Sequence, residues 1–305
     1  MIRSIKNIDP DFVVELDLGN VCNFKCSYCF PGANTGDRLW PDVDELSAAM
    51  INYLQAHKRK TRLYISGGET TLWKDLPEFC KNLKDNFDIV ISISTNGSKS
   101  LRWWNQYADC FDVVHISLHP EEGNVAHTIA VADLLYEKDI ETNVDILMSP
   151  KQFDKCVSIV DTVQRSKNKF PIIAKTVLFD GAHNYTDKQL EYMQEPLKRI
   201  PDMEWYNRVR RKARQTMVVD GKDVVYNDNY FVLNNLNHFK GWICHLGVDI
   251  VKIDHNGNVK GNCGQEVNQN IYTDKFFTIK PVICEQEICN CSGEMCATKW
   301  LPDEI

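Results

Sequence analysis

Short apolar segments alternate with longer amphipathic segments from residue 13 to about residue 180, and this alternation restricts the fold more than any other feature of the sequence. The short segments are rich in β-branched residues, which favour strands, and the longer ones space apolar residues three and four apart, which favours helices. Repeated strand–helix units predict a parallel sheet with right-handed crossovers and with helices on one face. The predicted strands are Val13–Leu18, Arg62–Ser66, Ile89–Ser94, Val113–Leu118, Thr142–Leu147 and Ile172–Leu178, and the predicted helices include Val43–His57, Leu76–Asn86, Val125–Lys138 and Phe153–Gln164.

The number of strand–helix units indicates an α/β fold in the form of an open barrel. Six units are fewer than the eight that close a TIM barrel, so we expect a partial (β/α)6 barrel over residues 10–200, with its site at the C-terminal ends of the strands. The character of the chain changes after about Asp180, and residues 201–305 are expected to form a smaller domain. Two hairpins are predicted in it, turning at Asp220–Gly221 and at Asn256–Gly257, because such dipeptides favour two-residue turns.

The composition is that of an average globular protein. Of the 305 residues, 43% are hydrophobic and 25% are charged, which argues against the disordered and fibrous classes. No apolar run approaches the roughly 18 residues of a membrane span and no signal peptide is recognisable, so we expect a cytoplasmic protein without a membrane partner. The net charge of -7 argues against a protein coated with nucleic acid, although a local basic patch would still bind phosphate.

Twelve cysteines are many for a cytoplasmic chain, in which clustered thiols bind metal more often than they form disulfides. Three of them lie between positions 22 and 29, and six lie between positions 244 and 296. The other three, Cys80, Cys110 and Cys156, are scattered along the chain and are expected to be small core residues. The two groups are therefore the candidate metal sites.

The first group, Cys22, Cys26 and Cys29, has the spacing C-x3-C-x2-C and follows the first predicted strand. Cysteine runs of this kind hold iron–sulfur clusters, and three thiolates leave one iron of a cubane open for a small bidentate ligand. A structural zinc site would need a fourth protein ligand, and this loop has none.

The next strand ends carry further motifs. The second predicted strand ends in the sequence Gly-Gly-Glu at 67–69, and the third closes with Ser-Thr-Asn-Gly at 94–97. In this order after the cysteine loop, the motifs resemble those of the radical S-adenosylmethionine (radical SAM) superfamily, whose members have a partial (β/α)6 barrel. The residues to which the resemblance assigns cofactor binding are Tyr28, Gly67, Gly68, Glu69, Ser94, Asn96, Ser117 and His115.

The resemblance also implies a chemistry. A [4Fe-4S] cluster on the three cysteines would bind S-adenosylmethionine, with the backbone of Tyr28 near the adenine and the Gly-Gly-Glu motif near the methionine amino group. An external electron donor of the flavodoxin or ferredoxin type would reduce the cluster, and cleavage would give a 5'-deoxyadenosyl radical that abstracts hydrogen from a substrate. Asn143 and Asp145 alternate along the fifth strand and are expected to point into the barrel.

The second cysteine group resembles the auxiliary-cluster region of the SPASM and twitch branches of the superfamily. Six cysteines are too few for two fully thiolate-bound cubanes, so we expect one auxiliary [4Fe-4S] cluster, with a structural zinc site as the alternative. Our choice of ligands is Cys244, Cys263, Cys289 and Cys291, with Cys284 as the substitute and Cys296 as a bystander.

Members of these branches act on peptides, protein side chains, sugars or nucleosides, so the substrate stays open between a nucleotide or nucleic acid and a peptide or protein side chain. A basic run favours the first, because it would bind phosphate. A non-catalytic iron–sulfur protein that transfers electrons or senses redox state is the alternative of another class, but it would not need a cofactor cradle. The basic run consists of Arg208, Arg210, Arg211, Lys212 and Arg214.

Overall fold

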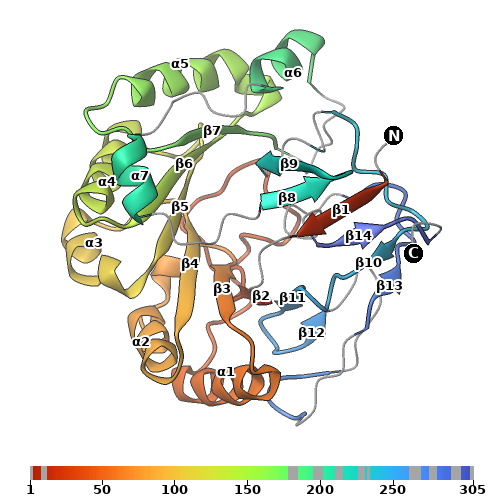
Figure 1. Ribbon diagram of the computed structural model, residues 1–305. Coiled ribbons are helices and arrows are strands. Elements are labelled where there is room, and N and C mark those ends of the chain that lie inside the picture. Colours follow the sequence, from red (N-terminus) through yellow and green to blue (C-terminus); the bar gives the residue numbers. More distant parts are fainter. Residues whose placement is uncertain are drawn as a thin grey trace.

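The computed structural model describes two β-sheets with helices along one face of the larger sheet (Figure 1). The larger sheet has eight strands in the order β12-β11-β2-β3-β4-β5-β6-β7, and all neighbours but β12 and β11 are parallel. The described residues are 3–7, 12–177, 185–194, 202–209, 216–225, 231, 234–260, 269–274, 280–289 and 297–302.

All six predicted strands are present, and they form the central part of the larger sheet. Their ends agree with the prediction to within one residue except at β7, which stops at Lys175. The strands are β2 (Phe12–Asp17), β3 (Thr61–Ser66), β4 (Ile89–Thr95), β5 (Val113–Leu118), β6 (Glu141–Leu147) and β7 (Ile172–Lys175).

Three of the barrel helices, α1, α3 and α4, begin where the sequence supplies a capping side chain. Asp42 accepts hydrogen bonds from two backbone N–H groups at the start of α1, and Ser100 and Asn124 cap α3 and α4 in the same way. Three predicted helices have the expected bounds, and the short helix α3 was not predicted. The helices are α1 (Val43–His57), α2 (Leu76–Asn86), α3 (Leu101–Tyr107), α4 (Val125–Glu137), α5 (Phe153–Gln164), α6 (Asp187–Gln194) and α7 (Met203–Val209).

Both predicted hairpins are present, but they belong to different sheets, and the second is connected by residues 254–258 rather than by the predicted two-residue turn. The hairpin of β11 (Ile250–Ile253) and β12 (Val259–Lys260) extends the larger sheet, because β11 pairs in parallel with β2. The hairpin of β8 (Thr216–Val219) and β9 (Lys222–Val225) ends the second sheet. The barrel sheet therefore contains a strand from the C-terminal third of the chain.

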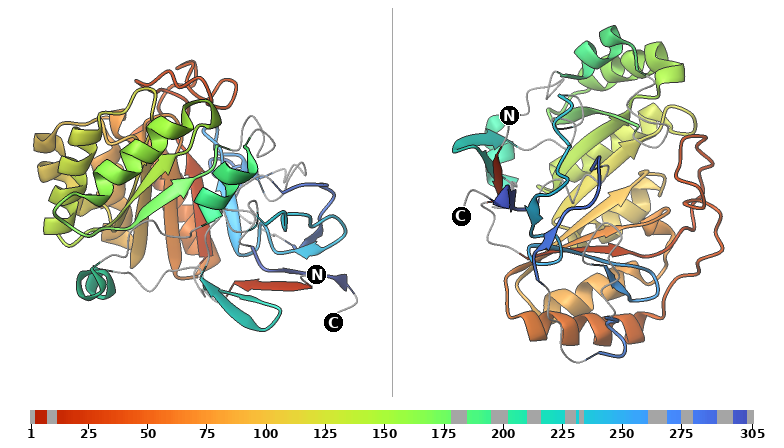
Figure 2. Two further views of the ribbon diagram at one scale, coloured as in Figure 1. Left: turned by 90° about the horizontal axis from the view of Figure 1, so that it is seen from above. Right: turned by 90° about the vertical axis from the view of Figure 1, so that its right-hand side faces the viewer.

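The second sheet has six strands in the order β13-β10-β14-β1-β8-β9, and it lies on the side of the barrel sheet away from helices α1 to α5 (Figure 2). Strand β1, from the N-terminus, lies between β14 and β8 and was not predicted. The remaining strands are β1 (Ser4–Asn7), β10 (Ile243–Cys244), β13 (Val282–Ile283) and β14 (Lys299–Trp300).

The two faces of the barrel sheet differ in polarity because side chains alternate along each strand. Buried aliphatic residues such as Val14, Leu63 and Ile91 pack under the helices in the main core. A second apolar cluster, which includes Ile5 and Ile250, joins the base of the sheet to the second sheet. Among the described residues, no helix is long and apolar enough to cross a membrane.

Candidate active site

The cysteine loop follows β2 and is held against the loop that follows β3. The backbone N–H of Gly68 donates to the carbonyl of Gly19 at 2.8 Å, and that of Glu69 donates to the carbonyl of Val21 at 2.8 Å. A Cβ atom on Gly68 would lie 2.3 Å from the carbonyl oxygen of Val21, so only glycine fits there. The glycines of the Gly-Gly-Glu motif therefore allow two loops to meet, which the sequence did not show.

Glu69 ties the ends of β3 and β4 together. Its buried carboxylate accepts hydrogen bonds from the backbone N–H and hydroxyl of Thr71, the hydroxyl of Thr95 at 2.6 Å and the backbone N–H of Asn96 at 2.6 Å. Three of these donors meet Oε1 and one meets Oε2, so the chain's own donors occupy Oε1 fully and Oε2 in part. Burial raises the pKa of Glu69. Its contact with the cofactor, implied by the resemblance, stays a prediction.

Asn96, at the end of β4, holds the cysteine loop from a second side. Its side-chain amide donates to the side-chain oxygen of Asn23 at 2.9 Å, and Asn23 donates to the hydroxyl of Ser98 at 3.0 Å. The backbone N–H of Ser98 in turn donates to the Asn96 side chain at 2.9 Å. The Ser-Thr-Asn-Gly motif thus holds Asn23, the residue directly after Cys22, in place.

Two residues after β5 hold the loop from a third side. The carboxylate of Glu121 accepts from the backbone N–H and the hydroxyl of Ser27, both at 2.6 Å. Nδ1 of His119 lies 3.3 Å from Sγ of Cys26 and 3.1 Å from the hydroxyl of Tyr28. Burial lowers the pKa of His119 to about 4, so its ring is neutral at pH 7. Sequence reasoning did not assign either residue, although their position directly after a barrel strand was a usable signal.

The three thiols of the loop differ in their surroundings. Cys26 is buried, whereas Cys22 and Cys29 are partly exposed. A hydrogen bond from Cys26 lowers the pKa of Cys29 to about 7, and burial raises the pKa of Cys22. The backbone N–H of Phe24 points to Sγ of Cys22 at 3.4 Å.

The donor set of this loop consists of three thiols. Within the described part of the chain, no three His, Cys, Asp or Glu side chains converge on one metal position. A [4Fe-4S] cluster needs no such convergence, because each cysteine binds a different iron. Three thiols from one anchored loop, Cys22, Cys26 and Cys29, are the ligands such a cluster would use.

Strand register places the remaining predicted contacts on the polar inner face of the sheet. His115 is paired with Ser94 on one side and with Asn143 on the other, and Ser117 is paired with Asp145. Asn143 donates to Asp145 at 2.6 Å, so the predicted neighbours on β6 do meet.

Charged side chains line the same inner face. Lys175 lies 3.7 Å from Asp145, and Lys252 of β11 lies 3.6 Å from Glu15 of β2. The hydroxyl oxygen of Ser92 is buried and has no hydrogen-bond partner among the described residues. The inner face is therefore polar and charged, in contrast to the face under the helices.

The C-terminal cysteines can be placed in part, since Cys263, Cys291 and Cys296 lie outside the described residues. Cys244 and Cys289 are both buried in the second apolar cluster, and the partly buried Cys284 packs at its margin. The backbone N–H of Leu246 points to Sγ of Cys244 at 3.4 Å, in the same relation as Phe24 and Cys22. Three of the six cysteines thus gather in one region.

Lys299 lies beside this group. It is only 2% exposed, and it is paired with Cys244 across β14 and β10, so both side chains lie on one face of the sheet. Its Nζ atom lies 4.3 Å from the centre of the Phe239 ring. The C-terminal cysteines therefore have a buried positive charge as a neighbour.

The scattered cysteines lie in the main core or against it. Cys80 and Cys156 are fully buried there, and Cys110 packs against it while partly buried. The prediction of core residues is confirmed for Cys80 and Cys156, whereas Cys110 lies at the edge of the core.

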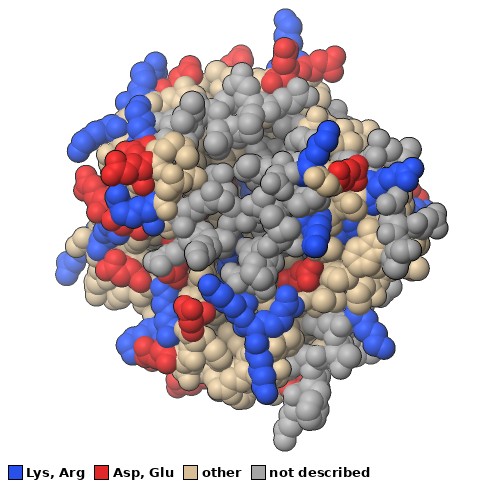
Figure 3. All heavy atoms as spheres, in the orientation of Figure 1, with Lys and Arg blue, Asp and Glu red and all other residues tan. Residues whose placement is uncertain are grey.

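The basic run is described only at Arg208. Its guanidinium lies 2.7 Å from the carboxylate of Asp139, which follows α4 and precedes β6. This position is at the N-terminal edge of the strands, opposite the cysteine loop, so Arg208 does not face the site. On the face seen in Figure 3, acidic and basic side chains are interspersed around the barrel. The other four members of the run lie outside the described residues.

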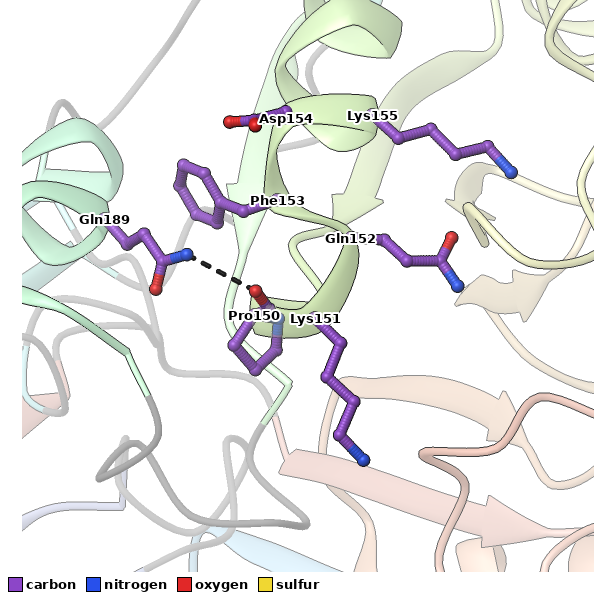
Figure 4. A pocket seen from close by; sticks show the side chains of 7 residues that line it. All are labelled: Pro150, Lys151, Gln152, Phe153, Asp154, Lys155 and Gln189. Carbon is purple, nitrogen blue, oxygen red and sulfur yellow. Dashed lines mark hydrogen bonds between the residues drawn. The ribbon is translucent and has the colours of Figure 1, made fainter.

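One shallow pocket of about 190 Å³ lies at the start of α5 (Figure 4). Gln189 closes one side through a hydrogen bond to the carbonyl of Pro150 at 3.3 Å. The side chains of Lys151 and Lys155 extend in different directions, and none of the predicted site residues lines the pocket.

Curated relatives share sequence mainly with part of the chain. A probable GTP 3',8-cyclase of Methanococcus maripaludis (strain C5) is 32% identical over 140 residues, which are 45% of this chain and 46% of that protein. The chain thus spans about half the length of this relative. A probable GTP 3',8-cyclase of strain C7 is 25% identical over 226 residues, 70% of this chain and 74% of that protein.

Solved structures share the fold at low sequence identity. The structure of anSMEcpe with bound AdoMet has a TM-score of 0.57 and 16% identity, covering 87% of this chain and 79% of that one. SuiB of Streptococcus suis, bound to its precursor peptide SuiA, has a TM-score of 0.53 and 12% identity, covering 89% and 64%.

The family profile described as Radical SAM superfamily matches residues 16–191, more than half of the chain. The matched segment includes the cysteine loop and all the strand ends that hold it. Because this profile covers the strands that build the site, the chain belongs to the radical SAM superfamily and is a radical SAM enzyme.

Proposed function

We propose that this enzyme binds a [4Fe-4S] cluster at Cys22, Cys26 and Cys29, cleaves S-adenosylmethionine reductively and removes a hydrogen atom from a polar substrate in the barrel. One observation carries the proposal: the cysteine loop is hydrogen-bonded to the ends of β3, β4 and β5 at once. Such anchoring fixes three thiols at the strand ends, where barrel enzymes bind their ligands.

The chain's own residues would orient the cofactor rather than carry the chemistry. When bound and reduced, the cluster and S-adenosylmethionine supply a 5'-deoxyadenosyl radical. Glu69 and Asn96 fix the loops around the cofactor, and the backbone of Tyr28 would lie near its adenine. The inner-face residues His115, Ser117 and Asp145 would face the cofactor or the substrate.

An auxiliary [4Fe-4S] cluster in the C-terminal region is the second part of the proposal. Cys244 and Cys289 lie in one apolar cluster with Cys284 at its edge, and a backbone N–H already points at the Cys244 sulfur. A thiolate-bound cluster there would place negative charge near the buried ammonium of Lys299, which pairs with Cys244 across the two strands. We therefore propose Cys284 as a further candidate ligand of this cluster, beside Cys244, Cys263, Cys289 and Cys291.

For the substrate we propose a nucleotide, since both Methanococcus maripaludis relatives are named as probable GTP 3',8-cyclases. The second candidate is a peptide or protein side chain, because a C-terminal auxiliary cluster resembles the SPASM and twitch branches. A flavodoxin or ferredoxin would supply the electron in either case.

Anaerobic reconstitution tests the proposal. With dithionite and S-adenosylmethionine, the protein should form 5'-deoxyadenosine, and its absence from fully reconstituted protein would leave only the non-catalytic iron–sulfur role. Two cubanes would give about eight irons per chain, whereas one cubane with a zinc site would give about four irons and one zinc. Deuterium transfer into 5'-deoxyadenosine from labelled GTP, compared with labelled peptides, would separate the two substrate classes.

A further inference from the structure

The cysteine loop closes around one histidine. Phe24 meets the ring of His119 edge-on at 6.0 Å, and Tyr28 stacks on it at 5.8 Å with an angle of 10° between the rings. Cys26 lies between these two residues in the sequence, and its Sγ atom is 3.3 Å from Nδ1 of His119. Three alternate residues of the loop therefore contact a side chain that comes from the end of β5.

The chemistry of a bound cluster fixes where the proton in this contact must lie. Cys26 as a ligand is a thiolate and has no hydrogen to donate. If Nδ1 of His119 also lacked a hydrogen, two electron pairs would face each other at 3.3 Å. In the favourable arrangement, the hydrogen is on Nδ1 of His119 and points at the Cys26 sulfur. The hydroxyl oxygen of Tyr28, 3.1 Å from the same nitrogen, is then a second acceptor.

We infer that His119 is a positioning residue for the cluster, which donates a hydrogen bond from Nδ1 to Sγ of Cys26 and thereby raises the cluster's reduction potential. The inference rests on the proposed function, since Cys26 must be a ligand. Hydrogen bonds to cluster sulfurs are a principal means by which proteins set these potentials. The same bond, with the Tyr28 stacking, fixes the ligand's orientation, as neighbouring groups do around other metals.

Two variants separate the hydrogen bond from the bulk of the side chain. His119→Leu removes the donor and keeps an apolar side chain of similar size, whereas His119→Asn places an amide nitrogen close to the position of Nδ1. We expect the midpoint potential of this cluster, followed by EPR through the signal that changes when S-adenosylmethionine is added, to become more negative in His119→Leu. It should stay near the wild-type value in His119→Asn. Equal potentials in all three proteins, with equal iron content, would overturn the inference.

A measurement on the unaltered protein covers the case in which His119→Leu does not retain its cluster. With 15N-labelled histidine, pulsed EPR of the reduced cluster should show a weak nitrogen coupling that disappears in His119→Asn. A strong coupling, typical of nitrogen bound to iron, or no coupling at all would contradict the hydrogen bond. If the wild-type loop binds no cluster, the proposed function fails instead, and iron analysis shows this separately.

Discussion

The two cysteine regions of the chain are built in opposite ways. The N-terminal loop is held by polar hydrogen bonds from three strand ends, and two of its thiols remain partly exposed. The described C-terminal cysteines lie in or beside an apolar cluster between two sheets, with Cys244 and Cys289 buried. A polar, partly exposed site would suit a cluster that binds and releases a ligand at one iron, whereas a buried, apolar site would suit a cluster that stays fully ligated.

The strongest test of this difference is the removal of one ligand from the first region. Cys26→Ala should abolish 5'-deoxyadenosine formation and remove about four of the irons, because three thiolates are the minimum for this kind of cluster. Anaerobic iron analysis and chromatography of the products measure both effects. Cys110→Ala, which changes a cysteine outside both regions, is the control and should keep the iron and the activity. If Cys26→Ala still cleaved S-adenosylmethionine, the first region would not be the cleavage site, and the comparison of the two cysteine regions would fail.

The matching change in the second region should have a different outcome. Cys244→Ala should also lose about four irons, but it should still form 5'-deoxyadenosine, because the proposed cleavage site lies on the other loop. Product formation from the true substrate should be lost. If Cys244→Ala loses zinc instead of iron, the second region is a structural metal site. If it loses neither metal, Cys244 is an ordinary core residue.

A smaller effect is expected from Gly68→Ala, which tests the anchoring of the first loop. The added Cβ would meet the Val21 carbonyl at 2.3 Å, and relieving such overpacking costs about 1–3 kcal/mol. Because the cysteine loop must shift, we expect weaker binding of S-adenosylmethionine, measured by equilibrium dialysis. Leu39→Ala on the same loop is the control, since the Leu39 side chain is 77% exposed. Equal loss of affinity in both variants would show that any loop substitution has this effect.

The smallest effect should follow Lys299→Met. This change keeps the length of the side chain and removes the buried charge beside Cys244, so the reduced, more negative state of an auxiliary cluster becomes less favourable. We expect a more negative midpoint potential for that cluster alone, measured by an EPR redox titration, and little change in Lys299→Arg. A shift in the other cluster's potential would mean that the two regions are not electrostatically independent.

The local parts of this structure could be predicted, and the contacts between distant segments could not. Periodicity identified the six barrel strands, and α1, α2 and α5 have the predicted bounds. The C-x3-C-x2-C loop and the two motifs after it follow consecutive strands, so their meeting at one end of the sheet could be predicted. Each of these signals lies within a few residues of the sequence.

The missed features depend on which strands become neighbours. His119 and Glu121 contact the cysteine loop from β5, some ninety positions away, and no local pattern reports such a contact. The resemblance assigns cofactor binding to Gly68, which stays a prediction, and the close approach of Gly68 to the Val21 carbonyl was not predicted. Strand β1 has four residues, too few for a periodic pattern, and it forms through pairing with β14 and β8.

The parallel pairing of Val13 with Ile250 has a consequence for the newly made chain. During synthesis β3 emerges soon after β2, but β11 emerges only when most of the chain has been translated. Until then one edge of β2 presents unpaired amide and carbonyl groups, which is a template for association with other chains. A shortened gene that ends after the barrel helices would keep that edge open permanently, directly below the cysteine loop. Recombinant production of the barrel segment by itself should therefore give aggregated protein unless β11 is supplied as a separate peptide or grafted onto the shortened chain.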